Sequence, residues 1–306
     1  MKKIIDAEVD EKAKKKRIKE VESEAWEDFL DMTISQAILW AGTNSAPQDK
    51  PSELQACDPY FIGSHSGASG AWLSGPEDLQ TAETKSEYFW GYNRMATVKG
   101  LFGAGDASGA SSHKFSDGSH AEGRIAAKAA IAFIVDNNTQ PNGDAAQIEE
   151  LKKKTLQPID TFNEFSGTTD NDDVNENYIV PEQYMYRLQK IMDEYAGGVS
   201  VGFQTNKAFL DIGLDLLAML KEDSEKLAAR DLHELMRAWE CMHRTMQAET
   251  HVRTVLAREE TRWPGYYFRA DFPEINNDKW LKFINIKMDP KTGEMQTIER
   301  PIYKIC

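Results

Sequence analysis

The amino-acid sequence predicts an α/β segment followed by a mainly α-helical domain that closes with a small carboxy-terminal β-hairpin. Three observations predict this order. Between Gly100 and Lys128 a short apolar strand runs into a loop of small residues and then a helix. From Pro181 to about Glu260, apolar residues recur at spacings of three and four, as in amphipathic helices. Near the carboxyl end, two short strand-like runs flank a turn composition.

The composition limits the classes of function. The chain has 306 residues, a length typical of roughly two domains. A net charge of −14 argues against nucleic acid or an anionic membrane as the main partner. No apolar run approaches the ~20 residues of a membrane span, so we expect no direct membrane insertion. The first residues do not form a secretory signal, and we expect a cytoplasmic protein.

Cysteine usage excludes a metal–thiolate site within the chain. The three cysteines are widely scattered and provide neither a C-x-x-C motif nor the ligands of an iron–sulfur cluster. Any iron–sulfur centre used with this chain must therefore belong to a partner.

The amino-terminal region is predicted to be helical. Residues 8–41 are typical of one long helix or two abutting ones. Residues 11–20 are charged nearly all round, which indicates a solvated helical face. From Trp26 the pattern becomes amphipathic, and Gly42 ends it. A second small-residue segment, residues 59–78, could begin with a short strand.

The segment from Gly100 to Lys128 has the features of half of a cofactor site. A strand is predicted over Val98–Ala104 and a helix over Ala121–Val135, introduced by the capping box Ser119-x-x-Glu122. Small side chains allow a flat or phosphorylated ligand to approach the backbone. Free amides at a helix amino terminus attract negative charge on such a ligand.

The carboxy-terminal region is predicted to be a helical bundle. A helix over Ala145–Leu156 and a polar stretch over Ser166–Asn177 precede it. Lys282–Lys287 and Met295–Glu299 form the predicted hairpin around a turn at Asp289–Gly293. Three apolar stripes, which we assign to bundle core, consist of Tyr184, Leu188, Ile191, Met192 and Tyr195; of Phe209, Ile212, Leu216, Leu217 and Leu220; and of Leu232, Leu235, Met236, Trp239, Met242 and Met246.

Several residues are candidates for chemistry, each with a plainer alternative. Gly100-x-x-Gly-x-Gly-Asp106 does not have the G-x-G-x-x-G spacing of a dinucleotide turn, and a tight structural turn is the alternative. Asp106 ends a strand, where it could accept hydroxyl hydrogen bonds. His65 lies in a glycine-rich loop and could act as acid, base or cationic anchor, or be an ordinary surface histidine.

Two further groups of residues also have a functional and a structural interpretation. His113 and His120 could form a metal site with His65, but no carboxylate or cysteine completes a recognisable spacing, so we predict no metal. Arg262 and Trp263 lie in a segment rich in Arg, Trp and Tyr that could meet an anion. A salt-bridged structural turn is the alternative there.

Taken together, these motifs resemble the flavoprotein subunits of the succinate dehydrogenase and fumarate reductase family, and within it the adenylylsulfate reductase branch. The resemblance covers essentially all 306 residues, but only the carboxy-terminal half or so of a typical member. The front half, with its G-x-G-x-x-G turn, is expected to be absent. The resemblance rests on Phe61–Gly67, Tyr92–Met95, Gly100–Asp106, Ser112–Phe115, Ser119–Lys128, Arg187–Tyr195, Lys221–Leu227 and Arg262–Tyr267.

The resemblance implies three parts and a flavin cofactor. Residues 1–57 would be the helical end of the capping domain, 58–145 the returning part of the FAD-binding domain, and 146–306 the helical carboxy-terminal domain. The fold is then an α/β remnant of an FAD-binding domain followed by helices. The residues it implies for FAD binding are Gly105, Asp106, Ser108, His113, Lys114, Gly118 and Ser119. The amides at Gly118 and Ser119 would face the flavin edge where negative charge develops on reduction.

The resemblance also implies a reaction. His65 matches the family's active-site histidine, and Arg262 and Trp263 are substrate-side candidates. Lys114 stands where fumarate reductases carry a dicarboxylate-binding arginine, and lysine cannot form that planar bidentate clamp. The implied activity is therefore reversible two-electron reduction of adenylylsulfate to sulfite and AMP through FAD. The implied partner is an iron–sulfur beta subunit, which forms a heterodimer with the flavoprotein and supplies the electrons. The alternatives are a related FAD-dependent oxidoreductase and an inactive truncated chain that only binds the beta subunit.

Overall fold

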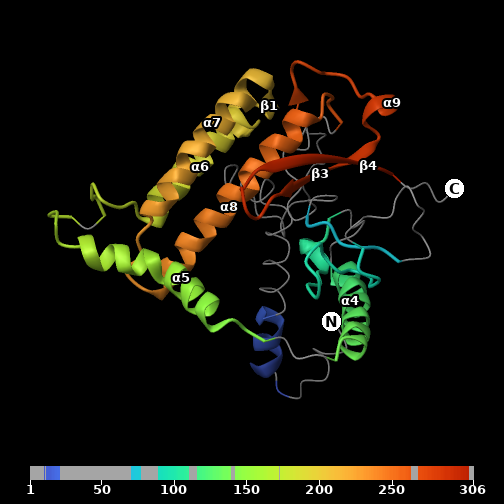
Figure 1. The fold of residues 1–306 in the computed structure, drawn as a ribbon, viewed down its shortest axis with the longest axis horizontal. Coiled ribbons are helices and arrows are strands. Elements are labelled where there is room, and N and C mark those ends of the chain that lie inside the picture. The colour runs from blue at the N-terminus through green and yellow to red at the C-terminus, as the bar shows by residue number, and fades with distance from the viewer. Residues whose placement is uncertain are drawn as a thin grey trace. The chain divides into compact units, whose positions relative to one another are not determined.

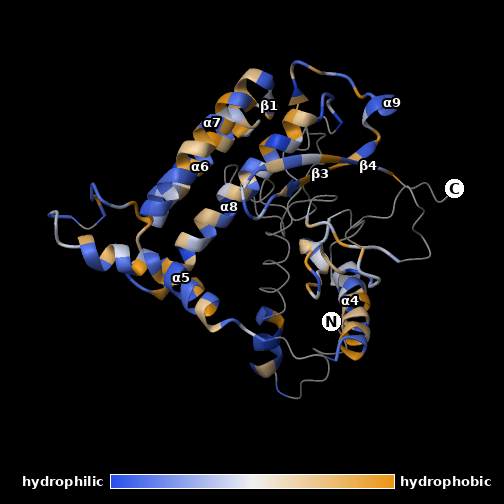
Figure 2. Cartoon of the chain, viewed as in Figure 1, coloured by the Kyte–Doolittle hydropathy of each residue, from blue (hydrophilic) through white to orange (hydrophobic). Residues whose placement is uncertain are grey.

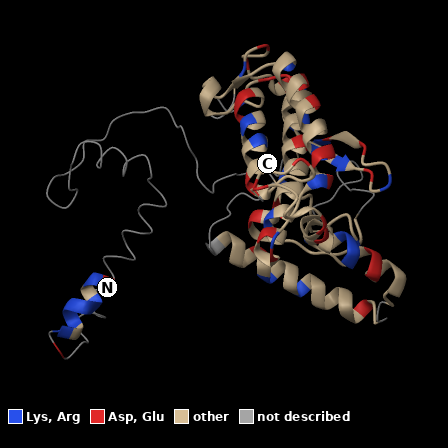
Figure 3. Cartoon of the chain, turned by 90° about the vertical axis from the view of Figure 1, so that its left-hand side faces the viewer, with Lys and Arg blue, Asp and Glu red and all other residues tan. Residues whose placement is uncertain are grey.

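The computed structural model divides the chain into two compact units, Met1–Ser64 and His65–Cys306. In the first unit, residues 12–20 are helical, and Lys and Arg residues, blue in Figure 3, make up most of this short helix. Its charged surface agrees with the predicted solvated face. The rest of the predicted helix over residues 8–41 lies outside the described residues. The residues that the structure describes are 10, 12–20, 70–76, 89–109, 116–138, 142–171, 173–262 and 268–302.

The second unit begins with short segments that surround one helix. A 3-10 turn, η2 (Gly105–Ala107), precedes the helix α4 (Ser116–Asp136). The predicted strand over Val98–Ala104 is wrong: this stretch is mostly a turn, with one antiparallel bridge between Met95 and Phe102. Gly100 has φ +87°, a conformation that reverses the chain and does not extend it.

The amino terminus of α4 also differs from the prediction. The helix begins at Ser116, so Ser119 is its fourth residue and cannot be its N-cap. The predicted capping box of Ser119 and Glu122 is therefore wrong. Gly118 and Ser119 still lie in the first turn, where backbone amides lack intrahelical acceptors.

The helix α5 (Ala145–Phe165) extends nine residues beyond its predicted end at Leu156. Asp144 caps it by accepting hydrogen bonds from the amides of Ala146 and Gln147. Pro158 lies inside the helix, and its carbonyl accepts a hydrogen bond from the Ala229 amide at 2.8 Å. Tertiary contacts therefore overcome the tendency of proline to end a helix.

Three helices form the bundle: α6 (Pro181–Tyr195), α7 (Lys207–Asp223) and α8 (Leu232–Ala257). Each contacts the other two, and α6 and α7 run side by side (Figure 1). The short turns η3 (Val199–Val201) and η4 (Ser224–Lys226) flank α7. Two residue pairs, β1 (Gln204–Thr205) and β2 (Phe268–Arg269), form a parallel ladder beside the bundle.

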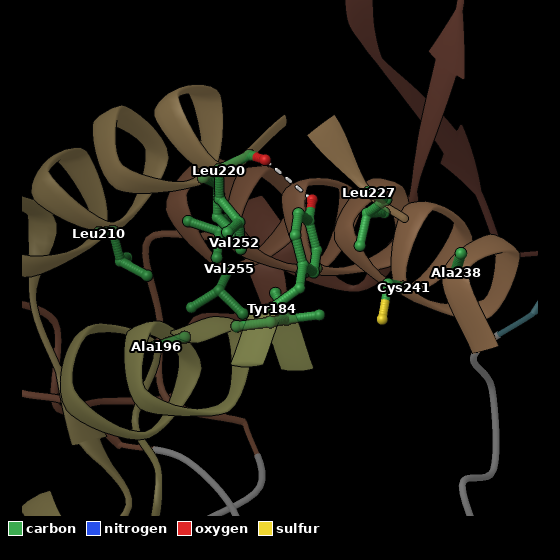
Figure 4. Packing of buried hydrophobic residues seen from close by; sticks show 12 residues of the cluster. Tyr184, Ala196, Leu210, Leu220, Leu227, Ala238, Cys241, Val252 and Val255 are labelled. Carbon is green, nitrogen blue, oxygen red and sulfur yellow. Dashed lines mark hydrogen bonds between the residues drawn. The ribbon is translucent and has the colours of Figure 1, made fainter. Parts of the chain in front are cut away.

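The bundle core is centred on Tyr184 and aliphatic residues of α7 and α8. The Tyr184 hydroxyl donates to the Leu220 carbonyl at 2.9 Å, deep among buried side chains (Figure 4). The first predicted stripe faces this core. The second and third are partly wrong, because Phe209, Ile212, Leu232, Met236 and Met246 are exposed. The inward positions include Gly213, Ala238, Cys241, Thr245 and Ala248, whose small side chains permit close helix packing.

The carboxy-terminal hairpin confirms its prediction. After the short helix α9 (Asn277–Trp280), β3 (Lys282–Met288) and β4 (Met295–Pro301) pair antiparallel from Lys282 opposite Pro301 to Met288 opposite Met295. Gly293 closes the turn with φ +72°, and its amide donates to the Asp289 carbonyl at 2.8 Å. Both strands contact α8. No helix in the described ranges is long and apolar enough to cross a membrane.

Candidate functional site

Glycine backbones meet closely where residues 70–76 pass the turn η2. The Ala71 amide donates to the Ala107 carbonyl, and the Gly109 amide donates to the Ala71 carbonyl, both at 2.8 Å. A Cβ atom on Gly70 would lie 2.6 Å from the Ser108 carbonyl carbon, and one on Gly109 would lie 2.9 Å from the Gly70 oxygen. These distances are too short for a side chain, so the two segments can meet only through glycine.

The turn η2 packs directly on the first turn of α4. Gly105 is buried and has φ +63°, and a Cβ there would lie 3.1 Å from Ser119 Oγ. Asp106 is exposed beside it, and Ser108 is buried. The structure therefore places Gly105 next to Ser119. That these residues and Asp106 bind a ligand stays a prediction.

Glu122 links these elements in a way that the sequence analysis missed. Its side chain is nearly buried, and Oε2 accepts a hydrogen bond from the Gly105 amide at 3.1 Å. Its Oε1 lies 3.6 Å from Arg94 Nη2. The signal was present in the sequence as an acidic residue in the second turn of a helix, but a capping role was assigned to it.

Arg94 lies in an unusual backbone conformation, with φ +61°. Its amide donates to the Ser74 carbonyl at 2.8 Å, and its carbonyl accepts from the Gly103 amide at 3.1 Å. Among the described side-chain atoms, Asn93 Oδ1 and Arg94 Nε are buried without a hydrogen-bond partner. Strain and unsatisfied polar atoms of this kind gather at functional sites.

The second half of α4 exposes large apolar side chains. Ile131, Ile134 and Val135 are each more than 60% exposed there. Figure 2 shows this apolar colouring along the helix. On the side that is packed, the Phe133 ring meets Tyr92 edge-on, and the Tyr92 hydroxyl donates to Asp136 at 2.9 Å. A helix that is apolar on most sides is normally covered by other protein.

The Arg262 guanidinium is held by a buried carboxylate. Glu260 is wholly buried, and it accepts from Arg262 Nε at 2.6 Å, Arg258 Nη1 at 2.7 Å and the Asn276 amide at 2.9 Å. Burial acts to raise the pKa of Glu260, but the hydrogen bonds from Arg262, Asn276 and Arg258 outweigh it and hold that pKa below its usual value. The geometry therefore matches the alternative of a salt-bridged turn, and a substrate contact of Arg262 stays a prediction.

Arg269 is a buried arginine that no sequence motif predicts. Its Nη1 donates to the carbonyls of Leu256 and Arg258 at 3.3 and 3.1 Å, and to that of Val255, at the end of α8. Its Nε pairs with Asp271, whose other oxygen accepts from the Lys207 amide at the start of α7. Arg269 and Asp271 thus join the ends of two helices. The positive charge of Arg269 lies at the carboxyl end of α8 and the negative charge of Asp271 at the amino end of α7, and both positions are favourable for the helix dipoles.

Four of the predicted site residues, His65, His113, Lys114 and Trp263, lie outside the described residues. His120 is exposed on α4. Within the described ranges, no group of three or more His, Cys, Asp or Glu side chains is placed to hold a metal ion.

Comparison with known proteins shows which proteins this chain is similar to. The chain is 46% identical over 290 residues to the adenylylsulfate reductase subunit alpha of Megalodesulfovibrio gigas, a match that covers 94% of this chain and 44% of that protein. It also matches the structure of adenylylsulfate reductase from Archaeoglobus fulgidus, with 53% identity and a TM-score of 0.82 over 95% of this chain and 45% of that one. The chain is a homologue of the adenylylsulfate reductase alpha subunit.

The homology concerns the carboxy-terminal portion of that subunit, and the chain spans less than half the length of these relatives. Residues 185–304 match the family model described as fumarate reductase flavoprotein C-term. A further structural match with the same coverage is an adenosine-5-phosphosulfate reductase in complex with sulfite as a covalent adduct. The quinol fumarate reductase of E. coli, at 21% identity and TM-score 0.51, shares the fold.

Two glycines lie at or beside the first turn of α4. Gly105 provides a bend without a side chain beside the first turn of α4, and a Cβ there would crowd Ser119. Gly118, in the same turn, also has no side chain. Close approach of a ligand to such a backbone is what glycine permits, and the helix amino terminus favours negative charge on that ligand.

Proposed function

We propose that this chain forms the carboxy-terminal portion of the flavoprotein subunit of an adenylylsulfate reductase. The activity is the reversible two-electron reduction of adenylylsulfate to sulfite and AMP. The observation that carries the proposal is the packing of Gly105 and Asp106 against the amino-terminal turn of α4 in a homologue that is 46–53% identical to adenylylsulfate reductases.

The residues that would hold FAD lie on two neighbouring segments of the chain. Gly105, Asp106 and Ser108 lie in or directly after the turn η2, and Gly118 and Ser119 lie in the first turn of α4. When bound, the flavin supplies two-electron transfer. The amides in the first turn of α4 would stabilise negative charge on a cofactor bound there, because a helix amino terminus carries partial positive charge.

Further roles come from the resemblance. His65 would orient or neutralise the sulfate oxygens of the substrate, and His113 and Lys114 would lie on the cofactor side. Lys114 favours this substrate over a dicarboxylate, since it does not form the bidentate clamp of an arginine. Arg262 and Trp263 remain substrate-side candidates. The pairing with Glu260 holds the Arg262 guanidinium in place.

The partners follow from the same proposal. Electrons come from an iron–sulfur beta subunit in a cytoplasmic heterodimer, in keeping with three scattered cysteines in this chain. The flavin site is completed by the part of the relatives' length that this chain does not match. The exposed apolar side chains of α4 support such a contact.

The proposal is tested with the 306-residue chain, alone and together with the amino-terminal portion of the Archaeoglobus fulgidus subunit. FAD is added, free cofactor is removed, and visible flavin absorbance is measured, followed by a titration with sulfite. We expect bound flavin whose absorbance bleaches with sulfite. A flavin-loaded protein that does not respond to sulfite contradicts an adenylylsulfate reductase and favours a related FAD-dependent oxidoreductase.

A second candidate function is binding to a partner subunit, which the exposed apolar side chains of α4 favour. On this alternative the chain is inactive and only binds the beta subunit. Gel filtration with that subunit separates the two functions, because co-elution without flavin colour supports binding alone.

A further inference from the structure

The carboxylate of Glu122 joins three segments that are distant in the sequence. It comes from the second turn of α4, is 7% exposed, and accepts the Gly105 amide at 3.1 Å. On its other side it faces Arg94 Nη2 at 3.6 Å. The turn at Arg94 and the turn η2 are therefore both held to α4 by one buried carboxylate.

Gly105 depends on an external acceptor for its amide. The turn η2 has three residues, and its own closing bond runs from the Ser108 amide to the Gly105 carbonyl at 2.9 Å. That bond leaves the amide at the start of the turn for another partner, which is Glu122. A buried amide without an acceptor costs roughly 1–3 kcal/mol, so the bond fixes where the turn lies on α4.

Arg94 makes this arrangement possible, because a carboxylate loses hydration when it is buried and needs a compensating charge. The Arg94 side chain is 25% exposed, and its backbone is held in a left-handed conformation by hydrogen bonds with Ser74 and Gly103. The backbone of Arg94 is thus fixed, and its guanidinium lies within ion-pair distance of Glu122.

We infer that Glu122 is a positioning residue of the flavin site, which holds Gly105 and Asp106 in register with the first turn of α4 through the Gly105 amide. The inference rests on the proposed FAD-binding function. On this inference, the side chain of Glu122 is long enough to bring its oxygen to the Gly105 amide, and Arg94 compensates its negative charge.

The experiment uses the 306-residue chain with FAD as the probe, completed by the amino-terminal portion of the Archaeoglobus fulgidus subunit. Glu122→Ala removes the acceptor, Glu122→Gln keeps an acceptor without charge, and Glu122→Asp keeps the charge but shortens the side chain by one methylene. Tyr92→Phe is the matched control, because it removes a contact at the opposite end of α4. FAD affinity and hydrogen exchange of the Gly105 amide are measured for each.

We expect Glu122→Ala and Glu122→Asp to weaken FAD binding at least about tenfold, because both lose the bond to the Gly105 amide. That amide should exchange faster in both variants. Glu122→Gln should restore affinity to within about threefold of the unmodified chain, since its oxygen can still accept. Tyr92→Phe should leave both measurements unchanged. Rescue by glutamine and failure of aspartate distinguish positioning from a general loss of structure.

The possible failures are distinguishable. If the unmodified chain binds no FAD, the proposed function is wrong and the inference falls with it. If the unmodified chain binds FAD and Glu122→Asp binds equally well, the inference is overturned while the proposed function stands. Equal weakening by glutamine and aspartate also overturns it, because the acceptor is then not what matters. Should Glu122→Ala fail to fold, the glutamine and aspartate variants give the same decision.

Discussion

Glu260 carries a negative charge into the interior of the protein, where N–H donors from Arg258, Arg262 and Asn276 surround it. The two arginines are themselves mostly buried. Removing the carboxylate leaves their charges without a partner in a poorly hydrated place, which is more harmful than losing an exposed ion pair.

Glu260→Gln should therefore lower the free energy of unfolding by about 3 kcal/mol, measured by urea denaturation. The neighbouring Glu259 provides the control, because its pair with Lys279 is exposed to solvent. Glu259→Gln should change the free energy of unfolding by less than about 1 kcal/mol. Equal effects of the two substitutions would show that burial of Glu260 adds nothing.

The same carboxylate predicts a dependence of stability on pH. Its pKa is lower in the folded protein than the usual value of 4.5, because the hydrogen bonds from its neighbours outweigh burial. Its contribution is fully present above pH 4.5 and is lost as the pH falls through the folded pKa. Melting temperatures measured between neutral and acidic pH should fall less steeply below pH 4.5 in Glu260→Gln. A parallel fall in both proteins would contradict the assignment.

At the scale of elements, helix ends are fixed by side-chain caps. Asn206 begins α7, and its Oδ1 accepts the Phe209 amide at 3.0 Å. Asn206→Ala should destabilise the protein by about 1 kcal/mol, because an amide at the helix start loses its acceptor. Asn206→Ser keeps an acceptor and should lose much less. Thermal unfolding of the two variants checks the difference, and equal losses would contradict a capping role.

The elements that could be predicted are those whose pattern is local. The stripe of α6 and the turn at Asp289–Gly293 follow from spacing and turn chemistry, and both are confirmed. The inward face of α8 could not be predicted from hydropathy, because Ala238, Cys241 and Thr245 are buried there while Leu232 and Met236 are exposed. Close packing of helices selects small residues, and a search for large apolar side chains overlooks them.

The candidate site was predictable only where glycine marks it. The glycines around Gly105 predict a bend, and the structure has one there, packed against Ser119. The roles of Glu122 and Arg94 depend on contacts across 17 and 28 positions of the chain, which no local pattern contains. His65, His113, Lys114 and Trp263 stay predictions.

At the scale of the molecule, the chain exposes a surface that suits contact with more protein. Ile131 and Ile134 on α4 are each more than 60% exposed. The relatives are more than twice as long as the matched segment. Apolar surface of this kind is stabilised when it is removed from water.

Ile131→Glu should therefore weaken association with the amino-terminal portion of the Archaeoglobus fulgidus subunit at least about tenfold, since a charge would be buried without a partner. Leu151→Glu, at an exposed apolar position of α5, is the control and should leave association unchanged. Co-elution in gel filtration measures both. Equal binding by Ile131→Glu would show that α4 is not the contact.

Cys241 lies in the bundle core, where burial raises the pKa of its thiol to about 11. At pH 8 only roughly one thiol in a thousand is ionised, and the reactive thiolate is also shielded from reagents. Alkylation of Cys241 should therefore wait for the bundle to open. A short pulse of iodoacetamide at increasing urea concentrations, followed by mass analysis of the Cys241 peptide, would measure the fraction of molecules in which the bundle of α6, α7 and α8 is unfolded. Modification in the absence of denaturant at the rate of a free thiol would contradict this expectation.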